Sequence, residues 1–128
     1  MNLITYAEEV VNKVVDIFPN DPCIMRERGR LFMAKNNYKK ALSYFNKSLK
    51  NIFDKDVAIN KCWALYKLHR YNEIMRIIDE KILKYDNTNS AAWHLKGQTL
   101  KKQHQIARAK YCFRKAEEYK IVPRSLLE

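Results

Sequence analysis

Apolar residues recur along this chain every three or four positions, in runs that short polar segments separate. In the first run, Ile4, Ala7, Val11 and Val14 share one stripe, with Phe18 at its edge, and the charged residues between them face the other way. Such spacing is typical of amphipathic helices. We expect about seven helices, over residues 2–17, 22–34, 38–50, 55–68, 71–84, a stretch around Trp93, and 106–119.

Polar turns separate these runs. Asp21 precedes Pro22 and is expected to cap the second helix, where a proline in the first turn loses no hydrogen bond. Asn36 and Asn37 form the next turn, and Asp54 is expected to cap the helix that follows. The most polar linker comes directly before the helix around Trp93 and covers residues 86–89.

The helices themselves repeat in pairs. One small or apolar position recurs in four second helices at spacings of 34, 33 and 35 residues: Ala7, Ala41, Ile74 and Ala109. An aromatic or β-branched residue follows each of them four positions later: Val11, Phe45, Ile78 and Phe113. Gly29, Cys62 and Gly97 mark a small position in the three first helices, so the same packing contact is expected in each pair.

The last pair has the fullest pattern, with Trp93, Gly97, Ala109, Phe113 and Ala116 on the facing sides of two consecutive helices. Small residues let the two backbones approach closely, and the two aromatic rings fill the space beside them. This stretch resembles a tetratricopeptide repeat (TPR), a 34-residue helix–turn–helix unit. The resemblance implies an all-α fold, a right-handed α-α superhelix or TPR-like solenoid, with Trp93 in its core.

The resemblance extends over nearly the whole chain. It divides the sequence into an N-terminal helix that completes a preceding repeat (1–20), three TPR-like repeats (21–53, 54–87 and 88–121), and a tail or start of a further helix (122–128). The sequence departs from the family pattern where leucine is expected before the small residue, at Arg28, Lys61 and Lys96.

In TPR solenoids the first helices line a concave groove that accepts an extended peptide or a helix. By position, the resemblance implies a groove lined by Arg26, Arg30, Met33, Trp63, Tyr66, Lys67, His94, Gln98, Lys101 and Lys102. Arg26 and Arg30 are one turn apart and could bind one carboxylate-rich segment, while Trp63 and Tyr66 are typical interface anchors. The alternatives are a solvated face for the arginines and packing against a neighbouring helix for Trp63.

The charge balance changes the picture most. Lys+Arg 25 against Asp+Glu 14 gives a net charge of +11, which favours acidic partners. Cys23, Cys62 and Cys112 lie far apart and are expected to be reduced thiols, as in the cytoplasm or the nucleus. No apolar run approaches the ~20 residues that span a membrane, and no signal peptide is visible.

These features predict a non-catalytic adaptor or scaffold that binds an acidic or mixed acidic–hydrophobic peptide as part of a larger assembly. The alternative is an RNA-binding helical-repeat protein, because +11 would attract phosphates. The candidate phosphate contacts are Lys101, Lys102, Arg108, Lys110, Arg114 and Lys115. The basic residues occur on both helices of each pair, and no side-chain code repeats at a fixed phase, which favours a protein partner.

Signals for other functions are weak. His69, His94 and His104 are isolated and no Gly-rich phosphate loop occurs, so we expect no catalysis, no cofactor and no metal. His69 is expected to be a turn residue. A TPR clamp for two carboxylates matches outright only at Asn60, which we interpret as a structural residue.

The C-terminal residues Ile121, Val122, Leu126 and Leu127 are apolar. Because a terminal repeat normally needs a polar cap, they indicate either a longer array or self-association through the terminal helices. A tail that folds back over the last helix is the alternative.

Overall fold

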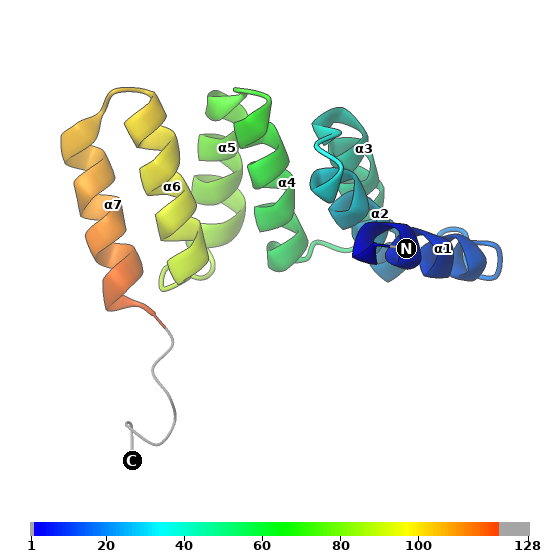
Figure 1. Cartoon of the computed structure of the whole chain (residues 1–128). Coiled ribbons are helices and arrows are strands. Elements are labelled where there is room, and N and C mark those ends of the chain that lie inside the picture. The colour runs from blue at the N-terminus through cyan, green and yellow to red at the C-terminus, as the bar shows by residue number, and fades with distance from the viewer. Residues whose placement is uncertain (1, 121–128) are drawn as a thin grey trace, which may run out of the picture. The chain divides into compact units, whose positions relative to one another are not determined.

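The computed structural model describes residues 2–120, and every regular element in that range is a helix (Figure 1). The elements are α1 (Leu3–Val15), α2 (Pro22–Ala34), α3 (Tyr38–Leu49), α4 (Lys55–Lys67), α5 (Tyr71–Ile77), its continuation η1 (Ile78–Leu83), α6 (Ser90–Lys102) and α7 (Ile106–Glu118). The expected all-α helical-repeat fold is confirmed. In the described residues, no helix has the length and apolar content needed to cross a membrane. The predictions for Ile121, Val122, Leu126 and Leu127 lie outside the described residues.

The chain forms two compact units, residues 1–70 and 71–128. The first unit contains α1 to α4, and the second contains α5, η1, α6 and α7. The boundary lies between the two helices of the repeat expected at 54–87. The division of the sequence into three repeats stays a prediction.

Side-chain caps start most of the helices. Asp21 accepts hydrogen bonds from the backbone N–H of Cys23 (2.8 Å) and Ile24 (3.3 Å) at the start of α2. Asp54 makes the equivalent bonds to Asp56 (2.8 Å) and Val57 at the start of α4. Both caps were predicted from the sequence. Further caps come from asparagines before α1, α3 and α6: Asn2, Asn37 and Asn89.

The three turns inside the helix pairs have the same geometry. Asn36, His69 and His104 adopt φ values of 60°, 60° and 62°, in the left-handed region. The next residue in each turn donates its backbone N–H over 2.9 Å to a carbonyl five positions earlier, as in a Schellman motif: Asn37 to Phe32, Arg70 to Leu65 and Gln105 to Leu100. His69 is therefore a turn residue, as expected.

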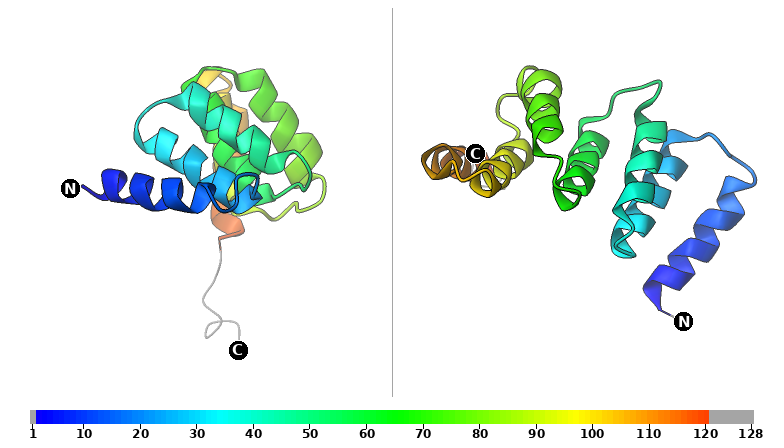
Figure 2. Two further views of the ribbon diagram at one scale, coloured as in Figure 1. Left: turned by 90° about the vertical axis from the view of Figure 1, so that its right-hand side faces the viewer. Right: turned by 90° about the horizontal axis from the view of Figure 1, so that it is seen from above.

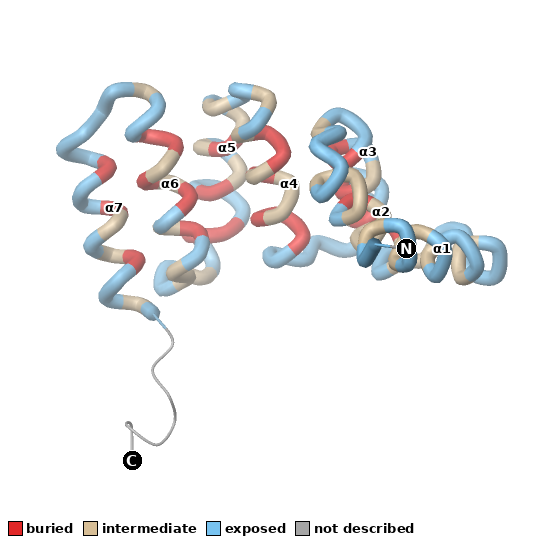
Figure 3. Tube along the Cα trace, viewed as in Figure 1, coloured by how far each residue is buried: buried red, intermediate tan, exposed pale blue. Residues whose placement is uncertain are grey.

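α2 packs against α3, and α6 against α7, as two helical hairpins (Figure 2). In each hairpin a glycine lies against an aromatic ring. A Cβ atom built on Gly29 would lie 2.4 Å from Cε1 of Phe45, and one on Gly97 would lie 2.6 Å from Cε1 of Phe113. The recurring position of the second helices is buried in all three pairs, at Ala41, Ile74 and Ala109. Buried residues occur on every helix from α2 to α7 (Figure 3).

A serine hydroxyl closes the other end of both hairpins, but from opposite sides. Ser48 of α3 donates to the backbone carbonyl of Pro22 over 2.8 Å. Ser90 of α6 donates to the carbonyl of Ala116 over 2.7 Å. Positions 22 and 90 are equivalent, as are 48 and 116, since each pair is 68 residues apart. The same contact is thus conserved between the hairpins while its donor changes helix.

The second unit contains a π-helical turn that sequence reasoning missed. α4 and α6 begin 35 residues apart, whereas α2 and α4 begin 33 apart. The longer interval contains η1, where the helix that starts as α5 widens to i→i+5 hydrogen bonding. Ile74, Ile78 and Ile82 stay buried as predicted, so the wider turn accommodates additional chain length without moving the apolar face out of the core.

Two expectations about burial were wrong. Trp93 was predicted to lie inside the core, but it is half-buried and packs against the edge of a core cluster that includes Leu100, while Leu95 and Leu100 are among the fully buried residues of α6. The predicted apolar stripe of α1 is also only half-buried, and Phe18 at its edge is 56% exposed. In the first unit α1 packs mainly against α2, which leaves the stripe partly uncovered.

We predict that Gly29→Ala lowers the free energy of unfolding by about 1–2 kcal/mol, because overpacking against Phe45 outweighs the ~1 kcal/mol that alanine adds as a helix former. Gly97→Ala should cost less, since Phe113 is only half-buried and can shift. Urea unfolding measures both. Phe45→Leu should relieve the clash, so the Gly29→Ala/Phe45→Leu variant should be less destabilised than the sum of the single changes. Simple additivity would contradict the contact.

Candidate functional site

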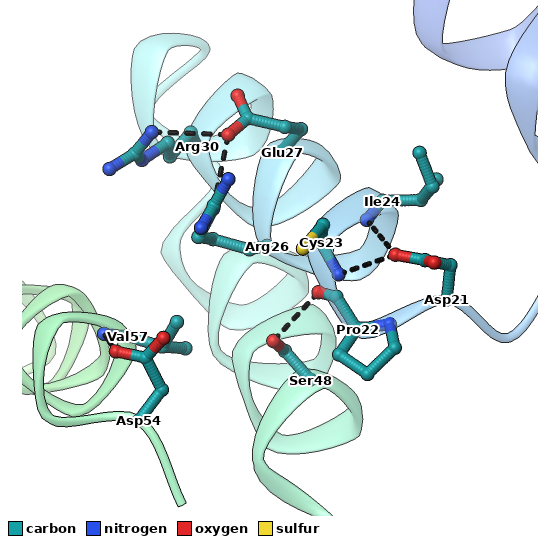
Figure 4. A network of polar contacts seen from close by, with 10 residues as sticks. All are labelled: Asp21, Pro22, Cys23, Ile24, Arg26, Glu27, Arg30, Ser48, Asp54 and Val57. Carbon is teal, nitrogen blue, oxygen red and sulfur yellow. Dashed lines mark hydrogen bonds and ion pairs between the residues drawn. The ribbon is translucent and has the colours of Figure 1, made fainter. Parts of the chain in front are cut away.

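Arg26 and Arg30 lie together on α2, as the spacing predicted, but a third residue joins them (Figure 4). Oε1 of Glu27 lies 3.1 Å from Nε of Arg26 and 3.1 Å from Nη1 of Arg30. The two guanidinium groups therefore share one carboxylate oxygen of their own helix. Sequence reasoning missed Glu27, although its i,i+3 spacing to Arg30 was visible.

This ion-pair cluster is open to solvent. The side chains of Arg26, Glu27 and Arg30 are 31%, 40% and 53% exposed. Ion pairs with that exposure contribute about 0–1 kcal/mol, because water screens the charges. A carboxylate from another molecule would therefore compete with Glu27 at little cost in folding free energy.

Trp63 and Tyr66 form an aromatic pair on α4. Their ring centroids are 5.4 Å apart and the ring planes meet at 72°, an edge-to-face contact. Both side chains are half-buried, and Lys67 beside them is exposed. Met33, the remaining predicted site residue of the first unit, is half-buried on α2.

Asn60 does not fit the structural role that the sequence suggested for its amide group. Its Nδ2 atom is buried and has no hydrogen-bond acceptor among residues 2–120. A buried donor without an acceptor costs about 1–3 kcal/mol. This amide nitrogen therefore does not contribute a stabilising contact between helices.

The other four predicted site residues lie on α6 in the second unit. His94 is exposed, and its ring centroid lies 5.7 Å from that of Phe113 on α7. Gln98 is half-buried, while Lys101 and Lys102 are exposed in the last turn of the helix. The two lysines are favourably placed beside the negative end of the helix dipole.

Cations over aromatic rings are a feature of both hairpins that sequence reasoning missed. Arg28 lies 4.6 Å from the ring centroid of Tyr44, and Lys96 lies 5.5 Å from that of Trp93. These are two of the three positions where the family pattern expects leucine. Each long side chain can cover apolar surface with its stem while its charge lies over a ring.

Ion pairs between successive helices also recur. Lys35, directly after α2, binds Glu8 of α1, and Lys96 of α6 binds Asp79 of η1 with 2.8 Å between Nζ and Oδ1. In both units, an acidic residue of a second helix contacts a basic residue in or directly after the following first helix.

Cys62 and Cys112 are poorly suited to nucleophilic chemistry. Burial raises the pKa of the Cys62 thiol to about 12, against which Lys61 acts only weakly. Burial likewise raises the pKa of Cys112, with smaller opposing effects from Lys96 and Arg108. Cys23 is exposed. Within residues 2–120, no three His, Cys, Asp or Glu side chains are grouped as metal ligands would be.

Comparison with known proteins adds two findings. The family model described as "Tetratricopeptide repeat" matches residues 27–54 and 90–120, which cover most of the α2–α3 hairpin and the whole α6–α7 hairpin. Over 56 residues, the chain is 38% identical to the anaphase-promoting complex subunit CDC16 of Saccharomyces cerevisiae. That match covers 44% of this chain and 7% of the length of the relative.

We predict that Cys23 alone reacts with Ellman's reagent in the native protein at pH 8, because a buried thiol with a raised pKa forms little thiolate. The absorbance should report one thiol per folded chain and three after unfolding in guanidinium chloride. Cys23→Ser should abolish the native signal. Rapid reaction of a second thiol in the folded protein would contradict the burial of Cys62 and Cys112.

The Cys62 thiol should also make folding sensitive to high pH. Its ordinary pKa is 9.0 and its folded pKa is about 12, so below pH 9 both states are protonated and its contribution is complete. Between about pH 9 and 12 only the unfolded state loses the proton, which lowers stability as pH rises. Urea unfolding over this range should show a steeper decline for the wild type than for Cys62→Ala. Equal slopes would contradict this expectation.

Proposed function

Because this chain belongs to the tetratricopeptide repeat family, we propose that it is a non-catalytic scaffold that binds an acidic or mixed acidic–hydrophobic peptide through its first helices. The ion-pair cluster of Arg26, Glu27 and Arg30 carries this proposal. Within the first unit the candidate residues on α4 extend this surface, and those on α6 are proposed as peptide contacts of the second unit. The partner peptide belongs to a larger assembly.

The scaffold role is supported by the packing function of the recurring residues. Gly29 with Phe45 and Gly97 with Phe113 hold the hairpins together, and the remaining repeat positions are buried apolar residues. Such positions determine packing and leave recognition to the exposed faces of the helices. CDC16 of Saccharomyces cerevisiae, which is similar over 56 residues, is by its name a subunit of a complex.

The acidic character of the peptide is supported by charge and geometry. The chain carries +11, and the two guanidinium groups of α2 already converge on one carboxylate oxygen. Glu27 therefore marks the place that a carboxylate of the peptide takes when it binds. Arginine suits this exchange because its planar fork can bind a carboxylate through two parallel hydrogen bonds.

The hydrophobic component is supported by Trp63 and Tyr66. Their edge-to-face contact holds two rings in place before any partner arrives, and both side chains keep part of their surface exposed. Rigid aromatic residues of this kind contribute disproportionately to binding, since little side-chain entropy is lost. An apolar residue of the peptide beside its acidic residues would pack there.

We predict that Glu27→Gln strengthens binding of a fluorescein-labelled peptide rich in glutamate and leucine by about three- to tenfold, because both guanidinium groups lose their internal carboxylate. Fluorescence anisotropy measures the dissociation constant. Glu9→Gln is the matched control, since it removes the same charge from an exposed residue of the same unit. Arg26→Glu/Arg30→Glu should abolish binding with little change in melting temperature.

Three outcomes would contradict the proposal. One is an equal gain in affinity from Glu27→Gln and Glu9→Gln, and another is unchanged binding by the double charge reversal. The third comes from the same titration with oligouridylate. If the chain binds this RNA tightly at low salt, loses it steeply as salt rises and ignores the peptide, the RNA alternative replaces this one.

A further inference from the structure

A cavity of about 380 Å³ opens on the α6–α7 hairpin, on a different face of α6 from the residues proposed above. This hairpin pocket lies entirely within the second compact unit. Its lining includes two buried residues, Leu100 and Cys112, two aromatic residues, Trp93 and Tyr111, and two cations, Lys96 and Arg108.

The α2–α3 hairpin indicates what this space is built to hold. Its equivalent positions lie 68 residues earlier, where Phe32 and Tyr44 stand in place of Leu100 and Cys112. The Phe32 and Tyr44 rings stack face to face, with centroids 5.4 Å apart and planes 1° from parallel. The first hairpin thus fills this region with its own aromatic rings, whereas the smaller Leu100 and Cys112 leave the hairpin pocket open.

The cations around these rings are retained in both hairpins. Arg28 lies 4.6 Å from the Tyr44 centroid and Lys40 lies 5.3 Å from that of Phe32. Their equivalents 68 residues later are Lys96 and Arg108, the two cations of the hairpin pocket. A cation is attracted to the face of an aromatic ring. The third pair therefore keeps both cations, with Lys96 over the ring of Trp93, but the positions of Phe32 and Tyr44 carry no ring.

The aromatic walls of the hairpin pocket are fixed in position. The Nε1–H of Trp93 donates to the backbone carbonyl of Asn87 over 2.8 Å, so the polar group of the indole is already satisfied. Tyr111, which is 46% exposed, lies with its ring centroid 6.1 Å from that of Trp93 at 78°. The indole therefore offers apolar and π surface to a ligand rather than a hydrogen-bond donor.

The two cations differ in how they are compensated. Lys96 is held by Asp79 of the π-helical turn, at 2.8 Å. Arg108 donates from Nη1 to the neutral Oε1 of Gln105 over 2.5 Å, and within residues 2–120 it forms no ion pair with a carboxylate. Arg108 thus keeps an uncompensated charge at the pocket, where a carboxylate of a ligand can form a charge-assisted hydrogen bond.

We propose that the hairpin pocket binds an aromatic side chain of a partner protein, with an adjacent carboxylate of that partner on Arg108. The volume, at the low end of the 300–1,000 Å³ range of ligand pockets, suits one side chain rather than a whole cofactor. This second site uses none of the residues of the α2 and α4 surface. Its test is therefore independent of the peptide site proposed there.

The test uses the fluorescence of Trp93. In a Trp63→Phe background Trp93 is the only tryptophan, and a capped Glu-Phe-Glu peptide should change its emission on binding. Replacing Phe by Ala, or both Glu by Gln, in the peptide should weaken binding about tenfold or more. Arg108→Gln should weaken binding about tenfold through loss of the charged hydrogen bond. Lys110→Gln, which removes an exposed charge of the same helix, is the matched control and should change little.

A second variant fills the hairpin pocket. Leu100→Phe/Cys112→Tyr restores the residues of the first hairpin, and if its melting curve shows a folded protein it should no longer bind the peptide. The indole N–H resonance of Trp93 in a ¹⁵N correlation spectrum gives an independent readout in the unfilled protein.

The proposal would be overturned by equal binding of the Phe and Ala peptides, by equal losses from Arg108→Gln and Lys110→Gln, or by unimpaired binding to the folded filled variant. Stronger binding of oligouridylate than of the peptide at the same salt concentration would assign the pocket to nucleic acid and overturn it as well. Arg26→Glu/Arg30→Glu should abolish binding of the glutamate–leucine peptide and leave the Trp93 response to the Glu-Phe-Glu peptide unchanged. That result would show that the two sites are separate.

Discussion

The close approach of a glycine to an aromatic ring is the contact on which both hairpins depend. At Gly29 and Gly97 there is no room for even one methyl group, because the rings of Phe45 and Phe113 already occupy the position. Once the ring is placed there, the distance between the two helices is set by its thickness. The Schellman turns at one end and the serine hydroxyls at the other then hold the pair in a single alignment. That the hydroxyl comes from α3 in one hairpin and from α6 in the other indicates that the contact matters and its donor does not.

Because the hairpins are held by so few residues, the remaining faces are free to vary, and charge has accumulated there. Leucine positions of the family pattern are taken by Arg28 and Lys96, which lie over rings. Such cations cover apolar surface and still keep a charge near solvent. They also explain why a strongly basic chain can fold compactly: several charges are placed over aromatic faces or beside an acidic residue of a neighbouring helix, as Lys96 is beside Asp79.

The fold was largely predictable from the sequence, and the reasons are local. Helical periodicity identified every helix, Asp21 and Asp54 were recognisable caps, and the spacing of Ala41, Ile74 and Ala109 located the buried seam. The predictions that were wrong or missed concern features that depend on contacts between helices. The depth of Trp93 and the exposure of α1 follow from which helices cover them, and the π-helical turn follows from one interval that is longer than the others. For the candidate site, periodicity put Arg26 and Arg30 on one face but did not reveal that Glu27 lies between their charges.

Comparing equivalent positions within one chain carries information that the repeat pattern alone does not. A repeat unit that merely needed to fold could use either pair of residues, Phe32 with Tyr44 or Leu100 with Cys112, because both pairs are compatible with the glycine–phenylalanine contact. Lys96 has a ring and a carboxylate beside it, Trp93 and Asp79. If Leu100 and Cys112 were simply a smaller core, however, Arg108, which contacts the neutral amide of Gln105, would be no better there than any other polar residue. Instead Lys96 and Arg108 remain where Arg28 and Lys40 lie over rings in the first hairpin. A retained Arg108 beside a pocket walled by Trp93 and Tyr111 is what a site for an external aromatic group with an adjacent carboxylate requires.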